Sequence, residues 1–307
     1  MNLRSKFIGT GVAIVTPFTI NGSIDWLALE HTIEHIINGG SEYIVSLGTT
    51  GEAITLSTNE CREVFAFTKE KVNGRVPLVA GLFGSNNTQT VLERFRNYNL
   101  EGFDAVLSSS PAYNKPSQEG IYQHYMKMGE VTPLPVIIYN VPGRTGSNVN
   151  AQTIARVAHG NENFFAVKEA TGNMQQGAEI LKLAPKDFLL LSGDDPTALP
   201  LIALGGKGVI SVIANAYPRA FSDMIRACLH NDWDTARQLN LALLDVHHWL
   251  YVENNPCGIK AALEILGICE RHVRLPLVPQ SDVNFERLRA EMERVQIALN
   301  HAEVIKN

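Results

Sequence analysis

The sequence has little of several features that mark particular classes of protein. Of its 307 residues, 19% are charged and 7% are aromatic, which is too little charge for a disordered chain. The net charge of −5 includes no block of basic residues, so we expect neither nucleic acid nor an anionic membrane surface as a partner. No segment approaches the roughly 18 consecutive apolar residues of a membrane span, and we therefore expect none.

Cysteine is also scarce. Four cysteines are widely spaced and form no C-x-x-C motif, which predicts reduced thiols rather than a disulfide framework or a zinc site: Cys61, Cys228, Cys257 and Cys269. The apolar stretch at 9–18 is interrupted by Pro17 and precedes no small-residue cleavage site, so it does not resemble a secretory signal. These observations favour a cytoplasmic protein.

Short, unbroken apolar runs recur along the chain, with longer helix-like segments between them. Continuous apolarity is typical of strands that are covered on both faces, as in a parallel sheet. The predicted strands lie within residues 11–18, 43–50, 77–84, 104–111, 135–142, 164–172, 188–195 and 208–215.

The segments between these runs carry helix signals. Asp25, Ser117 and Asn150 occupy N-cap positions, and Ser57 with Glu60 forms a capping-box pattern. Alternating strands and helices favour a (β/α)8 TIM barrel over residues 1–230 that carries the active site at the C-terminal ends of its strands. A doubly wound open sheet is the alternative, but no G-x-G-x-x-G fingerprint follows a predicted strand.

Residues 231–307 are predicted to form a C-terminal helical region packed on the barrel. Three helices are expected, near 232–250, 257–268 and 283–301. The last carries an apolar stripe with steps of three and four residues, which requires a packing partner: Phe285, Leu288, Met292, Val295 and Leu299.

Lys168 is the first candidate for chemistry, because it directly follows the apolar residues at 164–167. Burial disfavours a charged ammonium and lowers the pKa of a lysine, and a neutral amine can form a Schiff base with a carbonyl. Two simpler interpretations remain open from position alone. Lys168 could pair with Glu169, or its amine could reach solvent along the surface.

Three further clusters end predicted strands and strengthen the catalytic hypothesis. Tyr139 could serve as a general acid or base. The segment 48–52 (GTTGE) offers two hydroxyls and a run of backbone N–H groups for a carboxylate, and Arg144 offers a guanidinium for another. Taken singly, Tyr139 could be a half-buried core tyrosine, the two threonines of 48–52 could be turn formers, and Arg144 could be a surface charge.

The chain resembles the dihydrodipicolinate synthase family, within the pyruvate-dependent class I aldolase superfamily. The resemblance covers the whole chain through seven segments in order: GTGVAIVTPF, SLGTTGEAITL, PAYNKPSQEG, YNVPGRTG, KEATGN, SGDD and GGKGVISVIAN. It independently implies a barrel with a helical C-terminal part.

The resemblance implies catalytic roles for four residues. Lys168 matches the lysine that forms a Schiff base with pyruvate, and Tyr139 matches the acid/base tyrosine held over the imine. Thr49 matches the threonine of a proton relay. Tyr113 matches the tyrosine that crosses a dimer interface to complete the relay of the neighbouring subunit.

It also implies four substrate-binding positions. Thr50 matches the residue that binds the carboxylate of pyruvate, and Arg144 matches the arginine that recognises the carboxylate of the second substrate. Ile210 matches a pyruvate-site position whose backbone carbonyl faces the pocket. Gly193, followed by Asp194 and Asp195, resembles residues of the pocket wall, although the two aspartates could equally cap the next helix.

The implied reaction is the condensation of pyruvate with L-aspartate 4-semialdehyde to 4-hydroxy-tetrahydrodipicolinate, a step of lysine and diaminopimelate biosynthesis. No metal or organic cofactor is expected, because the lysine supplies the electron sink. A relay completed by a second chain implies at least a homodimer. The assembly expected from the family is a homotetramer built as a dimer of dimers, which the sequence alone does not separate from a dimer.

Two other functions remain as alternatives. A retro-aldol lyase for N-acetylneuraminate or a keto-deoxy sugar acid would share Lys168 and Tyr139, whereas Thr49 and Arg144 favour the synthase. A non-catalytic barrel that binds a keto acid is the third possibility, and retention of every relay residue argues against it.

One further motif suggests a metal. His31, Glu34 and His35 match H-x-x-E-H, a pattern found in zinc proteases. No partner carboxylate can be assigned from the sequence, and a catalytic zinc site normally needs three protein ligands. We therefore expect no metal here.

The sequence departs from the family at positions associated with feedback inhibition by L-lysine. Ala112 replaces the first tyrosine of the P-Y-Y-N motif, while Thr58, Cys61 and Thr90 occupy positions where lysine-sensitive relatives tend to carry two histidines and an acid. We predict weak or absent inhibition by L-lysine, because the groups that would bind it are missing. A titration of the condensation activity with L-lysine checks this, and full inhibition at sub-millimolar concentration would refute it.

Overall fold

The computed structural model describes residues 2–304, and within them parallel strands close into a barrel in the order β1 to β8. The eight strands of this part of the chain are β1 (Gly9–Ala13), β2 (Tyr43–Ser46), β3 (Leu78–Ala80), β4 (Ala105–Ser109), β5 (Val136–Asn140), β6 (Phe164–Glu169), β7 (Leu189–Ser192) and β8 (Gly208–Ser211). Each lies within or overlaps its predicted run, so the prediction of a TIM barrel is confirmed. Most strands are shorter than their runs, because the small and polar residues that end the runs form loops.

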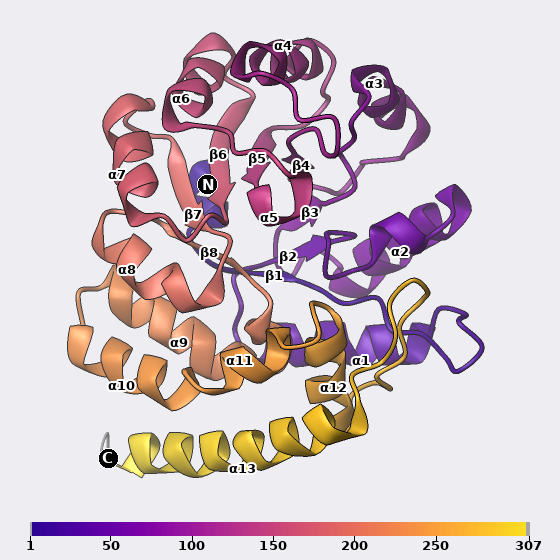
Figure 1. Ribbon diagram of the computed structural model, residues 1–307, viewed down its shortest axis with the longest axis vertical. Helices are drawn as coiled ribbons and strands as arrows, with labels where there is room; N and C mark the ends of the chain where they lie inside the picture. The colour runs from indigo at the N-terminus through magenta and orange to yellow at the C-terminus, as the bar shows by residue number, and fades with distance from the viewer. Residues whose placement is uncertain (1, 305–307) are drawn as a thin grey trace.

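Helices surround the barrel (Figure 1). They are α1 (Trp26–Asn38), α2 (Thr58–Val72), α3 (Thr88–Asn97), α4 (Gln118–Gly129), α6 (Ala151–Gly160), α7 (Met174–Leu183), α8 (Ala198–Ala203) and α9 (Pro218–Leu229). The predicted caps are confirmed: Asp25, Ser117 and Asn150 each accept a backbone N–H in the first turn, and Ser57 with Glu60 forms the capping box. A further short helix, α5 (Pro142–Thr145), lies in front of the strands in this view.

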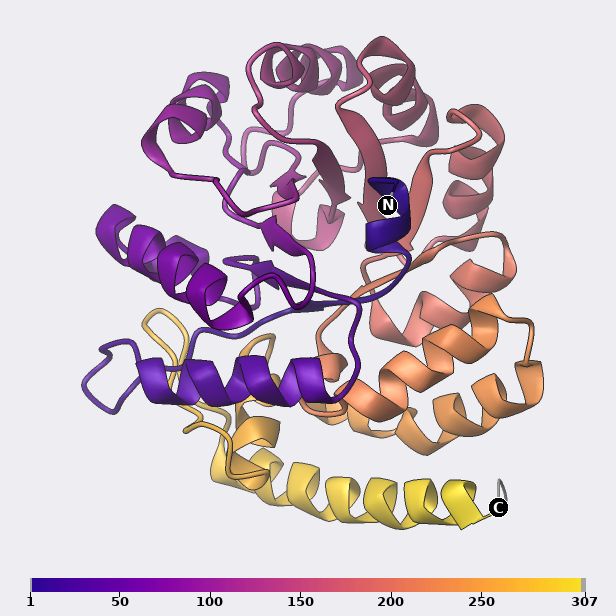
Figure 2. The ribbon, with the colours of Figure 1, turned by 180° about the vertical axis from the view of Figure 1, so that it is seen from behind.

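The barrel interior is a packed core rather than a channel. A 3₁₀ helix at Arg4–Phe7 lies across the N-terminal end of the barrel, where it is seen in front of the strands in Figure 2. The Phe7 ring lies with its centroid 5.3 Å from that of Tyr43 and 5.2 Å from that of Phe165. The opposite end, at the carboxyl ends of the strands, is therefore the one that can admit a ligand.

Helices α10 (Trp233–Leu243), α11 (Val246–Tyr251), α12 (Cys257–Ile265) and α13 (Asp282–Val304) follow the barrel. The prediction of one helix over 232–250 is wrong, because the chain turns at Leu244 and Asp245. This break lets α10 pack along α9 while α11 turns toward α12. The division of the chain into two units at residue 230 stays a prediction.

Helix α13 buries the apolar stripe that the sequence predicts on it. Phe285, Leu288, Met292 and Val295 are buried, and Leu299 packs partly buried against the same core.

Arg274, in the loop before α13, forms an ion pair with Glu60 on α2, and this contact lowers the pKa of Glu60 to about 2. No helix in the described part of the chain is both long and apolar enough to cross a membrane.

Replacing Leu288 by alanine should lower the free energy of unfolding by about 2–5 kcal/mol, since it would leave a cavity under α13. Its side chain has no exposed surface. Urea denaturation followed by circular dichroism measures the change. The control is Val283→Ala on the same helix: Val283 is 64% exposed, and its replacement should change stability by about 0.5 kcal/mol or less. Equal effects of the two substitutions would contradict this packing.

Candidate active site

Parallel pairing of β5 and β6 brings two of the predicted residues into contact at the carboxyl end of the barrel. Tyr139 and Lys168 are direct register partners on these neighbouring strands. The Lys168 Nζ lies 4.4 Å from the centroid of the Tyr139 ring, and the two residues are 4% and 8% exposed, respectively. The amine therefore faces the electron-rich face of an aromatic ring inside a largely closed space.

Lys168 does not pair with Glu169, so that simpler interpretation is wrong. Successive residues of a strand point to opposite faces, and Glu169 accordingly points away from Lys168. Its carboxylate accepts hydrogen bonds of 2.9 Å each from Asn140 Nδ2, Gln176 Nε2 and the Thr171 backbone N–H. Among the described residues, no carboxylate lies within ion-pairing distance of the lysine amine. The amine does not reach solvent freely either, given its burial.

Gly193 provides the space that the lysine side chain occupies. It follows β7, and its backbone N–H donates to the Glu169 carbonyl at 2.7 Å. A Cβ atom at this position would lie 3.0 Å from Lys168 Cγ and 2.6 Å from Ala170 Cβ. A side chain here would displace the lysine or its neighbour, which is a physical reason for glycine at this predicted pocket wall.

The GTTGE loop, residues 48–52, follows β2 as a tight turn. The Gly51 and Glu52 backbone N–H groups donate to the carbonyls of Gly48 and Thr49, both at 3.1 Å. Thr50 is 2% exposed, and its Oγ1 accepts a hydrogen bond of 3.0 Å from Asn255 Nδ2. Thr49 is partly buried. Both hydroxyls therefore belong to the C-terminal end of the barrel.

Arg144 is exposed on α5. Its Nη2 donates to the backbone carbonyl of Asn255 at 3.2 Å, which holds the guanidinium between α5 and the start of α12. The rest of the guanidinium is available to a ligand carboxylate.

Tyr113 is the predicted site residue that the structure does not bring into this chain's own barrel. It is 87% exposed and has a left-handed backbone with φ of 70°. Its backbone N–H donates to the Thr145 carbonyl at 3.1 Å, so the residue is fixed beside α5 while the side chain points outward. Such a large exposed aromatic side chain, held by a strained backbone, fits contact with another molecule.

Ile210 lies on β8, where its side chain is buried in the barrel interior next to β1. The role of its backbone carbonyl stays a prediction.

Asp195 does not cap the following helix, because its Oδ2 accepts the backbone N–H groups of Val212 at 3.0 Å and Ile213 at 2.8 Å. It thereby ties the end of β7 to the end of β8. Asp194 occupies the N-cap position of the next turn but makes no side-chain capping bond.

Two residues of the site were not predicted from the sequence: Asn255, which lies just before α12, and Lys260, which lies on it. Asn255 contacts Thr50 and Arg144, and Lys260 forms a buried ion pair with Glu52 of the GTTGE loop. The detectable signal was the lysine itself, which lies between apolar residues at the start of α12 and, once buried, needs an anion as its partner.

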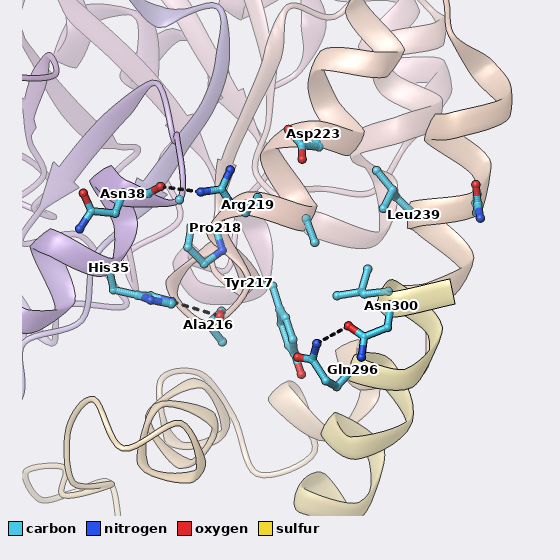
Figure 3. A pocket seen from close by; sticks show the side chains of 14 residues that line it. His35, Asn38, Ala216, Tyr217, Pro218, Arg219, Asp223, Leu239, Gln296 and Asn300 are labelled. Carbon is cyan, nitrogen blue, oxygen red and sulfur yellow. Dashed lines mark hydrogen bonds between the residues drawn. The ribbon is translucent and has the colours of Figure 1, made fainter. Parts of the chain in front are cut away.

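Two of the three H-x-x-E-H residues, Glu34 and His35, have partners other than a metal. Glu34 forms an ion pair with Arg75, and His35 Nε2 lies 3.2 Å from the Ala216 carbonyl. Within residues 2–304, no three His, Cys, Asp or Glu residues lie close enough to share an ion. His35 instead lines a cavity of about 470 Å³ between α1, α9, α10 and α13 (Figure 3).

Comparisons with known proteins identify the family. The model of the dihydrodipicolinate synthetase family matches residues 6–295. A relative from Parabacteroides distasonis, named 4-hydroxy-tetrahydrodipicolinate synthase, is 45% identical over 94% of this chain and 97% of its own. A relative of the same name from Flavobacterium psychrophilum is 47% identical over 92% of this chain and 96% of its own.

Solved structures agree with these relatives. The dihydrodipicolinate synthase of Aquifex aeolicus superimposes with a TM-score of 0.91 at 39% identity, covering 94% of this chain and 98% of that one. The 4-hydroxy-tetrahydrodipicolinate synthase of Methylacidiphilum fumariolicum SolV gives a TM-score of 0.93 at 38% identity, covering 97% and 98%. The names of these relatives favour the synthase over the sugar-acid lyase. The chain belongs to the dihydrodipicolinate synthetase family and is an enzyme of that family.

Proposed function

We propose that this chain condenses pyruvate with L-aspartate 4-semialdehyde to form 4-hydroxy-tetrahydrodipicolinate, through a Schiff base on Lys168. The observation that carries the proposal is the buried pair of Lys168 and Tyr139, with the amine 4.4 Å from the ring centroid. An amine without a paired carboxylate at the end of an apolar barrel is suited to attack on a carbonyl carbon.

The first stage is the capture of pyruvate. The Lys168 Nζ adds to the keto carbon, and water leaves as the iminium forms. The iminium withdraws electrons from the adjacent methyl group, which loses a proton to give an enamine. The Tyr139 phenol lies against the amine and is the group that we expect to carry these protons. The lysine supplies the electron sink, so the proposed chemistry needs no metal or organic cofactor.

The second stage joins the two substrates. The enamine carbon attacks the aldehyde carbon of L-aspartate 4-semialdehyde, and the aldehyde oxygen takes a proton to become a hydroxyl. The substrate amino group then attacks the iminium carbon and closes the ring. Lys168 leaves as a free amine, ready for another molecule of pyruvate.

The substrate carboxylates have separate binding groups in this proposal. The Thr50 hydroxyl accepts a hydrogen bond from Asn255, so its own proton is free to donate to the pyruvate carboxylate. Gly193 and the Ile210 carbonyl would border the bound pyruvate. Arg144 has an exposed guanidinium at the rim, suited to the carboxylate of the second substrate.

The proton relay requires a second copy of the chain. We propose that Tyr113 reaches across a homodimer interface to Thr49 of the neighbouring subunit and thus completes a Tyr139–Thr49–Tyr113 chain. Its 87% exposure supports this assignment, because the ring makes little contact within its own chain. We further propose that two such dimers form a homotetramer.

A cytoplasmic location fits the four cysteines, which are free and buried thiols.

Borohydride reduction in the presence of pyruvate should attach the substrate to Lys168, because only an imine on that amine is expected to be trapped. Peptide mass mapping locates the adduct. The Lys168→Ala variant should give no adduct and no ring product, whereas Lys182→Ala, an exposed lysine on α7, should behave like the parent. Trapping on another lysine, or ring formation by Lys168→Ala at the parental rate, would contradict the proposal. Cleavage of N-acetylneuraminate without condensation would favour the lyase.

Replacing Tyr113 by phenylalanine should reduce kcat by about 10²-fold or more while leaving pyruvate trapping nearly unchanged, because only the hydroxyl of the relay is lost. Steady-state kinetics and the borohydride assay measure the two effects separately. The control is Tyr122→Phe on α4, whose ring packs under Arg156 on the outer surface. If Tyr113→Phe turns over at the parental rate, the relay between subunits is wrong.

A further inference from the structure

Segment 255–260, in the C-terminal part of the chain, contacts the GTTGE loop at two points. Asn255, just before α12, donates from Nδ2 to Thr50 Oγ1 at 3.0 Å. Lys260, on α12, donates from Nζ to Glu52 Oε1 at 2.5 Å. A segment of six residues from outside the barrel thus holds both a substrate-binding hydroxyl and the end of the loop that carries it.

The contact with Asn255 gives the Thr50 hydroxyl a direction. An amide N–H can only donate, so the hydroxyl oxygen must accept this bond and its own proton must point elsewhere. Thr50 and Asn255 are 2% and 5% exposed, so little water competes for the same positions. The hydroxyl is therefore preset as a donor, which is the orientation that binding of a carboxylate requires.

The ion pair of Lys260 with Glu52 is fully buried. The two side chains are 0% and 1% exposed, respectively. Lys260 Nζ also donates to the His272 carbonyl at 2.8 Å, and Glu52 Oε2 accepts the Arg274 backbone N–H at 3.1 Å. Burial lowers the pKa of Lys260, and the Glu52 carboxylate opposes that shift. Loss of one partner would leave an uncompensated charge in the interior, whereas loss of both would not.

The loop needs such support because its ends have an unfavourable backbone. Leu47 and Glu52 have φ of 56° and 52°, in the left-handed region that non-glycine residues rarely adopt. Such conformations are unfavourable for residues that carry a Cβ atom, and they persist only where the surroundings hold them. The ion pair anchors the Glu52 side chain and so holds one of these two ends.

We propose that Asn255 and Lys260 are positioning residues for pyruvate: Asn255 orients the Thr50 hydroxyl as a donor, and Lys260 holds the loop through Glu52. The inference rests on the proposed function, because it assigns the Thr50 hydroxyl to the pyruvate carboxylate. Neither residue contacts the reacting atoms, and both act through the loop. The C-terminal helical region is accordingly part of the active site's construction.

Two substitutions of Asn255 separate positioning from packing. Asn255→Asp keeps the shape but replaces the N–H donor by an acceptor, so the Thr50 proton turns toward the aspartate. Asn255→Ala leaves a small cavity and a free hydroxyl. We expect the KM for pyruvate to rise about tenfold or more in Asn255→Asp, the size of a hydrogen bond to a charged group, and to rise less in Asn255→Ala. A purely structural role predicts the reverse order, since alanine loses more contact, and that order would overturn the assignment.

The ion pair is tested by a double-mutant cycle of Lys260→Met and Glu52→Gln. Lys260→Met should raise the KM for pyruvate, and adding Glu52→Gln should recover part of that loss because no unpaired charge remains. Thermal unfolding of each variant separates loss of the fold from loss of binding. Folded variants that all bind pyruvate with the parental KM would refute the role of Lys260.

The same experiments distinguish this inference from the proposed function. Asn97→Asp, an exposed asparagine on α3, controls for the added charge and should leave the KM for pyruvate unchanged. If the parent protein forms no borohydride-trapped adduct with pyruvate, the proposed function fails. If the parent forms the adduct and Asn255→Asp traps pyruvate at the same low concentration as the parent, only the positioning inference fails.

Discussion

Closure of the parallel sheet, where β8 pairs with β1, is the constraint on which the rest of the structure depends. Since every strand runs in the same direction, the carboxyl ends of all of them meet at one end of the barrel. The register of β5 with β6 then sets Tyr139 beside Lys168, although 28 residues separate them along the chain, and the ends of β2 and β7 lie around the same opening. The 3₁₀ helix with Phe7 fills the other end, so chemistry is confined to one side.

Successive side chains of β6 point to opposite faces of the sheet, so Lys168 and Glu169 have different surroundings. Lys168 faces the barrel interior with no carboxylate partner in the described part of the chain, while Glu169 points outward and satisfies its charge with three hydrogen-bond donors. Because those donors come from β5, α7 and the loop after β6, the carboxylate ties together the backbone on both sides of the lysine. The Lys168 amine therefore has no ion-pair partner in this part of the chain. The hydrogen bonds of Glu169 hold the strand that carries it.

The helices after the barrel complete the same site from outside. Asn255 joins Thr50 to Arg144, two groups suited to two different carboxylates, and Lys260 anchors the loop through a buried charge. Charge pairs without access to water are costly to break, so this connection is stiff rather than adjustable. In the proposed function, the barrel supplies the reacting groups, and the helical region supplies the support that keeps one wall of the site in place.

The sequence by itself determined the order and type of most elements, because apolar runs, capping residues and helical periodicity are local signals. The approximate positions of the strands, the caps at Asp25 and Ser57 and the stripe on α13 were all predictable, and the motifs around Lys168 and Tyr139 indicated the family. Tertiary structure alone decided the partner of Glu169, the tie of Asp195 to β8, the turn between α10 and α11 and the contacts of Asn255 and Lys260 with the GTTGE loop. The first three depend on how strands and helices pack against one another in the folded chain. The contacts of Asn255 and Lys260 join groups some 200 positions apart, and no pattern of neighbouring residues encodes a hydrogen bond or an ion pair over that separation.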